Sequence, residues 1–185
     1  KVVFEPINQI SRARNMGAKE ASGKNLIFLD ADTKVSHQLL KMALDSLNLR
    51  QSGGGGSTLI FDSNQNQFIL GTLVPCFWSW ISKTFKLAAG SFIFCRKEIF
   101  EEIGGFSDKL FAGEEILFSQ QLKKECKKNG LNFLIFDDFP VVTSSRKLMW
   151  YSSFRILIFI FIPIIFPWSL RFRSLCSFWY HRPPK

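Results

Sequence analysis

Short apolar runs alternate along this chain with segments whose apolar positions recur at helical spacing. Continuous apolar runs of this length are expected of strands buried on both faces of a sheet. They cover residues 25–29, 58–61, 91–95 and 131–136. Alternation with helical segments is typical of an α/β domain. We therefore predict an α/β fold with a mostly parallel sheet flanked by helices.

Helical periodicity predicts helices in four of the segments between these runs. They are residues 11–22, the segment that follows Ser36, 97–103 and 114–128. Ser36 can cap its helix, and a glycine that can end a helix follows each of the other three. The stretch 68–87 is apolar and aromatic but irregular, with Pro75 inside it, so its pattern predicts no single element.

The sequence QSGGGGS at residues 51–57 resembles a flexible spacer between two domains. The helix before it and the strand after it nevertheless fit as consecutive elements of one α/β layer. We interpret Gly53 or its neighbour as the stop of the preceding helix, and the remaining glycines as a short flexible hinge that leads into the next strand. Connections of this kind lie opposite the ligand-binding end of such a sheet, which argues against a phosphate loop.

The C-terminal part of the chain has a different composition. Residues 156–170 are almost wholly apolar, but the run is shorter than the roughly 20 residues of a spanning helix and contains Pro163 and Pro167. Basic and aromatic residues of the kind found at lipid head groups follow it: Arg171, Arg173, Trp179, Tyr180, His181, Arg182 and Lys185. We predict an α/β domain at 1–150 and a membrane-associated tail at 151–185. A core helix or a hydrophobic hairpin at 156–170 is the alternative.

Composition limits the classes of function. With 185 residues, 46% of them hydrophobic and 21% charged, the chain is expected to form one globular domain with an appendage. A net charge of +9 favours anionic partners, but the basic residues follow no nucleic-acid-binding module, so no nucleic-acid partner is expected. The four widely spaced cysteines suggest reduced thiols rather than a metal site.

Two carboxylates follow the apolar run at 25–29. Asp30 and Asp32 stand one residue apart, and side chains at this spacing point to the same side of a strand. Hard oxygen ligands suit Mg²⁺ or Mn²⁺ that is also held by a substrate's phosphates, and α/β sheets bind ligands at this end of their strands. An ordinary turn at the end of a strand is the alternative.

Two further groups could carry chemistry. Glycines at 104–105 precede the acidic pair 114–115 at the start of a predicted helix, where the helix dipole alone also favours acids. Arg12, Arg14 and Asn15 begin the first predicted helix, where they could meet diphosphate oxygens or form a solvated face.

The order of these groups resembles that of a known family. The stretches ARNMGAKEASGKNLIFLDADT and GSFIFCRKEIFEEIGGFSDKLFAGEEILFSQQLKK together resemble the family 2 glycosyltransferases of the GT-A fold, over roughly residues 11–146. The Gln-x-x-Arg-Trp motif of processive synthases does not occur in the chain, which favours an enzyme that adds one sugar at a time.

The resemblance assigns roles to individual residues. Asp30 and Asp32 would engage a divalent metal, Mn²⁺ or Mg²⁺, and the diphosphate of a nucleotide-sugar donor, with Asp32 favoured as the direct ligand. Arg14 and Asn15 match positions on the donor side. Gly104 and Gly105 match the wall of the sugar and acceptor pocket.

The general base falls on one of two glutamates. Glu115 stands where the family usually has the Asp of a Glu-Asp pair, and the longer side chain leaves the choice between Glu115 and Glu114 open. The resemblance implies an inverting, metal-dependent transfer to a glycan or lipid-linked acceptor, by a membrane-associated protein whose active site faces the cytoplasm. A nucleotidyltransferase and a non-catalytic membrane-associated fragment are the alternatives.

The start of the chain also departs from the family. Family members begin with nucleotide-binding βα units, and no such residues precede Lys1. We therefore expect a chain that lacks the first nucleotide-binding units and that is inactive or weakly active alone.

Overall fold

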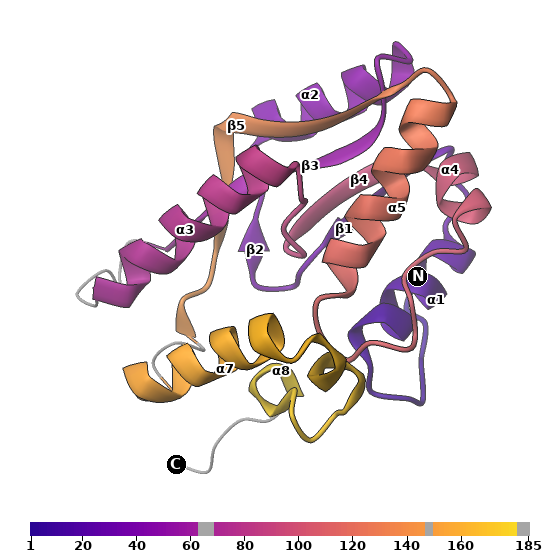
Figure 1. Ribbon diagram of the computed structural model, residues 1–185. Coiled ribbons are helices and arrows are strands. Elements are labelled where there is room, and N and C mark those ends of the chain that lie inside the picture. The colour runs from indigo at the N-terminus through magenta and orange to yellow at the C-terminus, as the bar shows by residue number, and fades with distance from the viewer. Residues whose placement is uncertain (63–68, 147–149, 181–185) are drawn as a thin grey trace.

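The computed structural model describes residues 1–62, 69–146 and 150–180 (Figure 1). Its single sheet has five strands in the order β1-β4-β3-β5-β2. They are β1 Asn25–Leu29, β2 Thr33–Lys34, β3 Ser52–Phe61, β4 Phe92–Arg96 and β5 Asn132–Thr143. The helical elements are α1 Ile10–Glu20, α2 His37–Asn48, α3 Ile69–Phe85, α4 Lys97–Glu102, α5 Glu114–Lys128, α7 Ser153–Ile165, the 3₁₀ helix η2 Pro167–Arg171 and α8 Ser177–Tyr180. An α/β fold is confirmed.

The direction of the strands corrects the prediction of a mostly parallel sheet. Only β3 and β5 pair in parallel, whereas β4 is antiparallel to both of its neighbours and β2 is antiparallel to β5, so the described sheet is mixed. Helices cover both of its faces, and a strand buried on both faces is continuously apolar whichever way it runs. The apolar runs therefore located four of the five described strands, all except β2, and carried no information on their direction.

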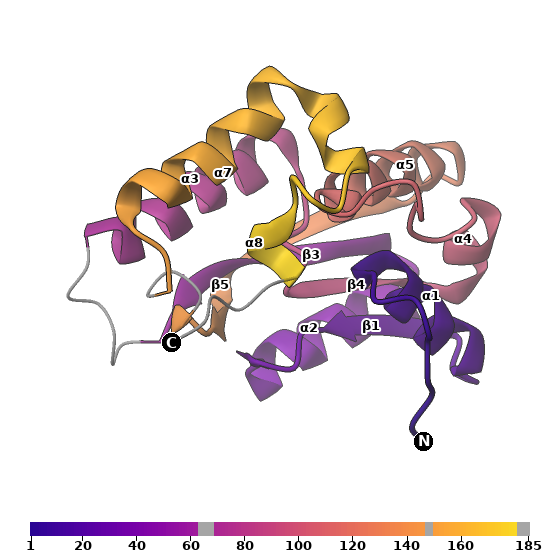
Figure 2. The ribbon, with the colours of Figure 1, turned by 90° about the horizontal axis from the view of Figure 1, so that it is seen from below.

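Strand β4 shows how the two faces are filled. Phe92 and Phe94 point to the side of α2, while Ile93 and Cys95 point to the side of α5, and all four are fully buried. Figure 2 shows α2 on one side of the sheet and α3 and α5 on the other. This alternation, a consequence of the two-residue period of a strand, fixes α5 over the middle of the sheet.

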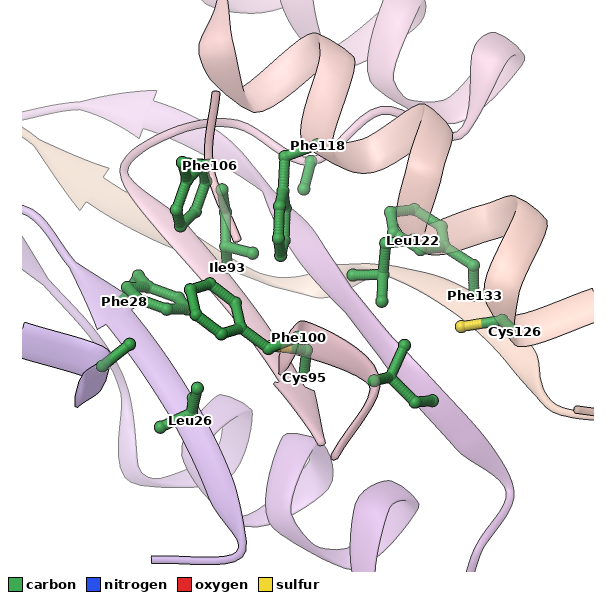
Figure 3. Close-up of a cluster of buried hydrophobic side chains, with 13 residues drawn as sticks. Leu26, Phe28, Ile93, Cys95, Phe100, Phe106, Phe118, Leu122, Cys126 and Phe133 are labelled. Atoms are coloured by element: carbon green, nitrogen blue, oxygen red, sulfur yellow. The ribbon is translucent and has the colours of Figure 1, made fainter. Parts of the chain in front are cut away.

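Aromatic rings join α5 to the first strand. The rings of Phe106 and Phe118 stack with centroids 4.1 Å apart, and the ring of Phe28 meets Phe106 edge to face at 5.0 Å (Figure 3). Each aromatic contact of this kind contributes about 0.5–1.5 kcal/mol to stability, in addition to the effect of the apolar area that it buries. They hold the end of β1, the segment around Phe106 and the first turns of α5 together, and the candidate site lies where these elements meet.

The glycine run is part of a central strand, so its interpretation as a flexible hinge is wrong. All four glycines lie within β3, between β4 and β5, and are buried. A Cβ atom on Gly55 would lie 1.9 Å from the carbonyl oxygen of Leu134, and one on Gly53 would lie 2.6 Å from Sγ of Cys126. The turn after α2 is made instead by Arg50, whose φ is 55°.

The C-terminal elements pack against the loop that precedes α5. The backbone N–H of Phe111 donates to the carbonyl of Leu170 at 2.7 Å, and Ile156 and Cys176 are fully buried. Within the described residues, no helix has both the length and the apolar content that crossing a membrane requires. The end of the predicted tail, His181 to Lys185, lies outside the described residues, and the division at residue 150 stays a prediction.

Candidate functional site

Arg14 of α1 joins two of the predicted acids. Its Nη1 donates to Oε1 of Glu114 at 2.8 Å, and its Nη2 donates both to Oδ1 of Asp30 at 3.0 Å and to the carbonyl of Gly90 at 2.8 Å. The guanidinium also lies over the ring of Phe106, 5.3 Å from its centroid. The side chain is only 11% exposed, so these contacts fix a buried cation between the end of β1 and the start of α5.

The two aspartates lie in a turn after β1 rather than in the strand itself. The backbone N–H of Thr33 donates to the carbonyl of Asp30 at 3.0 Å, which closes this turn. Asp30 faces Arg14, whereas Oδ2 of Asp32 lies 3.9 Å from Nη2 of Arg146. Both aspartate side chains are more than 40% exposed, so a ligand in solvent can contact either carboxylate.

This pair of carboxylates fits a divalent cation in its chemistry. Among the described side chains, no group of three His, Cys, Asp or Glu residues is close enough to form a metal site. Asp30 and Asp32 together could supply two protein ligands, and a cation held by one or two carboxylates typically takes its other ligands from substrate phosphates and water. The residues present therefore suit Mg²⁺ or Mn²⁺ that arrives with a phosphate ligand.

Glu114 and Glu115 open α5 after Gly113, whose φ of 70° is a left-handed conformation that suits glycine. Glu114 is 3% exposed, and burial raises its pKa although Arg14 opposes that effect. Glu115 is half-buried, and its burial, with the charge of Glu114 beside it, raises its pKa to about 7. The two neighbours are thus different: Glu114 is held in an ion pair, while the carboxyl of Glu115 can exchange a proton near neutral pH.

Gly90 lies between the arginine and the glutamates, and the candidate residues identified from the sequence did not include it. A Cβ atom at this position would lie 3.2 Å from Nη2 of Arg14 and 3.7 Å from Cδ of Glu115. The backbone of Gly90 therefore forms the wall between the two side chains. The glycine that begins the stretch GSFIFCRK is the signal that could have identified it.

Helix α1 also holds the loop between α4 and α5. The side-chain amide of Gln9 donates to the carbonyls of Asp108 and Leu110 at 2.7 and 2.8 Å. The guanidinium of Arg12 forms an ion pair with Asp108 at 3.1 Å. Arg12 thus faces this loop rather than the acids around Arg14.

Asn15 contributes to the same attachment. Its amide donates to the carbonyl of Phe106 at 2.8 Å and accepts from the N–H of Phe106 at 2.9 Å. The structure places Asn15 on the glycine segment rather than next to the acids, so its role in donor binding stays a proposal.

Gly104 and Gly105 have positive φ values of 77° and 74°, which only glycine adopts readily. A Cβ atom on Gly105 would lie 2.7 Å from Oδ1 of Asn15, so the close approach of α1 also requires glycine there. A cavity of about 280 Å³ is lined by both glycines, Asn15 and Phe100. A larger cleft of about 740 Å³ lies along β1 and α1, and Arg14 and Asp30 are part of its lining.

Comparison with models of protein families gives a match. The model of the family described as "Glycosyl transferase family 2" matches residues 1–104, more than half of the chain. The match includes α1, β1 and both aspartates and ends before the two glutamates. No curated protein matches the chain.

Proposed function

The chain belongs to glycosyltransferase family 2, and on this basis we propose that it transfers a sugar from a nucleotide-diphosphate donor to an acceptor hydroxyl, with inversion and with a divalent metal. The observation that carries the proposal is the contact of Arg14 with both Asp30 and Glu114, next to Glu115. It brings the acids at the end of β1 and at the start of α5 to one guanidinium.

Glu115 is the proposed general base. An inverting displacement needs one group that takes the proton of the acceptor hydroxyl as this oxygen attacks the sugar carbon. Glu115 is half-buried and has a pKa of about 7, so near neutral pH it is ionised in part and can accept a proton. Glu114 is the weaker candidate, because its carboxylate is buried against Arg14.

Arg14, Asp30 and Asp32 are proposed to serve the donor. Asp30 and Asp32 would hold the metal, with Asp32 as the direct ligand because Arg14 already engages one oxygen of Asp30. When bound, a divalent metal stabilises the charge that develops on the departing nucleoside diphosphate. Arg14 keeps Asp30 in place and counters the negative charge of Glu114, while Gly104 and Gly105 would line the donor and acceptor pocket.

The acceptor is proposed to be a glycan or a lipid-linked molecule, and the active site is proposed to face the cytoplasm. The four cysteines, all within the described residues, are free thiols, which suits a reducing compartment.

Release of nucleoside diphosphate tests the proposal. A panel of nucleotide sugars is incubated with the protein and candidate acceptors, with Mn²⁺, with Mg²⁺ and with a chelator. Metal-dependent release of nucleoside diphosphate that requires Glu115 supports the proposal. Release of pyrophosphate from a nucleoside triphosphate and a sugar phosphate would instead identify a nucleotidyltransferase.

A further inference from the structure

Helix α7 carries an apolar stripe on its solvent side. The stripe follows the spacing i, i+3, i+4, i+7, i+10 and i+11 and consists of Phe154, Leu157, Ile158, Phe161, Ile164 and Ile165. All six side chains are at least 37% exposed, and Phe154 reaches 73%. The opposite side of the helix holds Ile156, which is 1% exposed. One side of α7 therefore packs on the protein, and the other presents a continuous apolar face to solvent.

Helix α3 presents a second exposed group. Phe77, Trp80 and Phe85 are each more than half exposed, and their rings form a row with centroid separations of 6.2 and 6.3 Å. Figures 1 and 2 show α3 and α7 on the same side of the sheet, running alongside each other. We call the six α7 residues together with these three aromatic residues the apolar face.

The charged residues in the part of the sequence that contains α7 have one sign. From Phe139 to the end of the chain there are seven Lys or Arg residues and no Asp or Glu. Arg155 lies in α7 itself, and Arg171 and Arg173 follow at the end of η2 and just beyond it; all three are exposed. An apolar stripe followed by arginines and by Trp168 of η2, which is 57% exposed, has the composition of helices that lie in the interface of an anionic membrane.

We propose that the apolar face docks on the surface of an anionic lipid membrane, with α7 lying in the plane of the interface. A second copy of the chain is a poorer occupant, because Arg155, Arg171 and Arg173 next to each α7 stripe would bring like charges together. Anionic head groups complement the arginines, and the acyl boundary takes up the apolar side chains. α7 meets the membrane side-on, since its other side is packed on the protein.

The docked segment also contacts the loop before the glutamates. Downstream of α7, the carbonyl of Leu170 accepts from the N–H of Phe111 at 2.7 Å, and Oη of Tyr180 donates to the carbonyl of Phe111 at 2.8 Å. Docking therefore anchors the loop that leads to Glu114, through Leu170 and Tyr180. That the membrane delivers a lipid-linked acceptor to the two glutamates rests on the proposed function; docking itself does not.

Flotation with lipid vesicles tests docking without any donor or acceptor. The protein is mixed with vesicles of phosphatidylcholine alone and with vesicles that contain phosphatidylglycerol. We expect binding to the anionic vesicles that weakens as salt rises. Phe161→Glu and Ile164→Glu should each lower the vesicle partition coefficient by about tenfold or more, and Arg155→Glu should lower it on anionic vesicles only.

Leu49→Glu is the matched control. Leu49 is 68% exposed and follows α2, on the other side of the sheet, so the same change there should leave binding unaltered. Circular dichroism shows whether each variant is folded. The proposal would be overturned if the folded wild-type protein did not bind vesicles, or if Leu49→Glu lost as much binding as the α7 variants. It would also be overturned if the protein did not bind vesicles but formed a dimer that Phe161→Glu disrupts. A wild-type protein that binds vesicles but transfers no sugar would instead count against the proposed function.

Discussion

Nη1 of Arg14 lies 2.8 Å from Oε1 of Glu114, and the carboxylate is 3% exposed. A buried carboxylate that is paired with a buried guanidinium is costly to separate, because either partner left alone keeps its charge away from water. The pair also connects α1 to α5, which are far apart in the chain. The position of the candidate base next to Glu114 thus depends on a residue in the first helix.

Replacement of Arg14 by Ala should destabilise the protein and abolish activity. The change leaves Glu114 buried without its cation, for which we expect a loss of about 3–5 kcal/mol in the free energy of unfolding. Arg12→Ala is the matched control, since Arg12 forms an exposed pair with Asp108 and its loss should cost about 1 kcal/mol or less. Urea unfolding measures both. Equal losses in the two variants would show that the buried pair has no special weight.

The pH dependence of transfer should identify the base. Because the pKa of Glu115 is raised to about 7, kcat/KM should rise with pH through about 7 as this carboxyl loses its proton. Glu115→Gln should lower kcat by about 10²–10⁴-fold. Glu114→Gln should keep the rise but move it to lower pH, because the charge of Glu114 is one of the causes that raise the pKa of Glu115.

Stability gives a second measurement on the same residue. A carboxyl whose pKa rises on folding, here from 4.5 to about 7, favours the folded state most below pH 4.5, and this contribution is lost as pH rises to 7. The free energy of unfolding of Glu115→Gln, relative to that of the wild type, should therefore be higher at pH 8 than at pH 5. Chemical unfolding of both proteins at the two pH values measures this difference. If this difference were the same at pH 5 and pH 8, and Glu115→Gln were fully active, the general base would be Glu114.

Much of the local structure was predictable, because it depends on local signals. The helix after Ser36 was found from its apolar spacing and its cap, and the N–H of Leu39 indeed donates to Oγ of Ser36 at 3.1 Å. The helix at 114–128 matches α5, where the acids stand at its first turn and a glycine follows its end. Strand direction was not predictable, since burial on both faces gives the same apolar run in either direction.

The candidate site was predictable as a set of residues and not as a geometry. The order of motifs selected Arg14, Asp30 and Glu114, but no spacing in the sequence shows that one guanidinium contacts both acids. Asn15 was assigned to the donor, and its amide is found on the backbone of Phe106. The position of a long side chain depends on which neighbours surround it, and these come from distant segments.

Asp32 should dominate metal binding. Asp32→Asn removes the charge of the acid that does not contact Arg14, so we expect about tenfold or more weaker binding of Mn²⁺ in the presence of a nucleoside diphosphate. Titration calorimetry measures this without any turnover. Asp45→Asn, an exposed acid on α2, is the control and should bind as the wild type does. Equal affinity of all three proteins would remove Asp32 from the metal site.

The glycine strand offers a test in which one substitution has opposite signs at two positions. Gly55→Ala places a methyl group 1.9 Å from the carbonyl oxygen of Leu134, so the strands must separate and we expect a loss of at least about 3 kcal/mol. Gly17→Ala, at an exposed position of helix α1 with no atom within 4 Å of the new methyl, should gain about 0.5–1 kcal/mol. If thermal unfolding showed that Gly55→Ala is tolerated as well as Gly17→Ala, the glycine run at 53–56 would form a hinge after all.

Tyr180 should connect the C-terminal segment to catalysis. Its Oη donates to the carbonyl of Phe111, and the N–H of Ile10 donates to it at 3.4 Å, so one hydroxyl joins the segment after α7 to the loop before Glu114 and to α1. Tyr180→Phe keeps the ring and should cost only about 1 kcal/mol of stability. A loosened loop misplaces the glutamates, for which we expect kcat to fall by about tenfold. Binding to anionic vesicles should stay unchanged, because the apolar face is intact. Parallel measurement of kcat and vesicle binding separates the two effects: a variant with normal kcat would show that the loop holds its position without this hydroxyl.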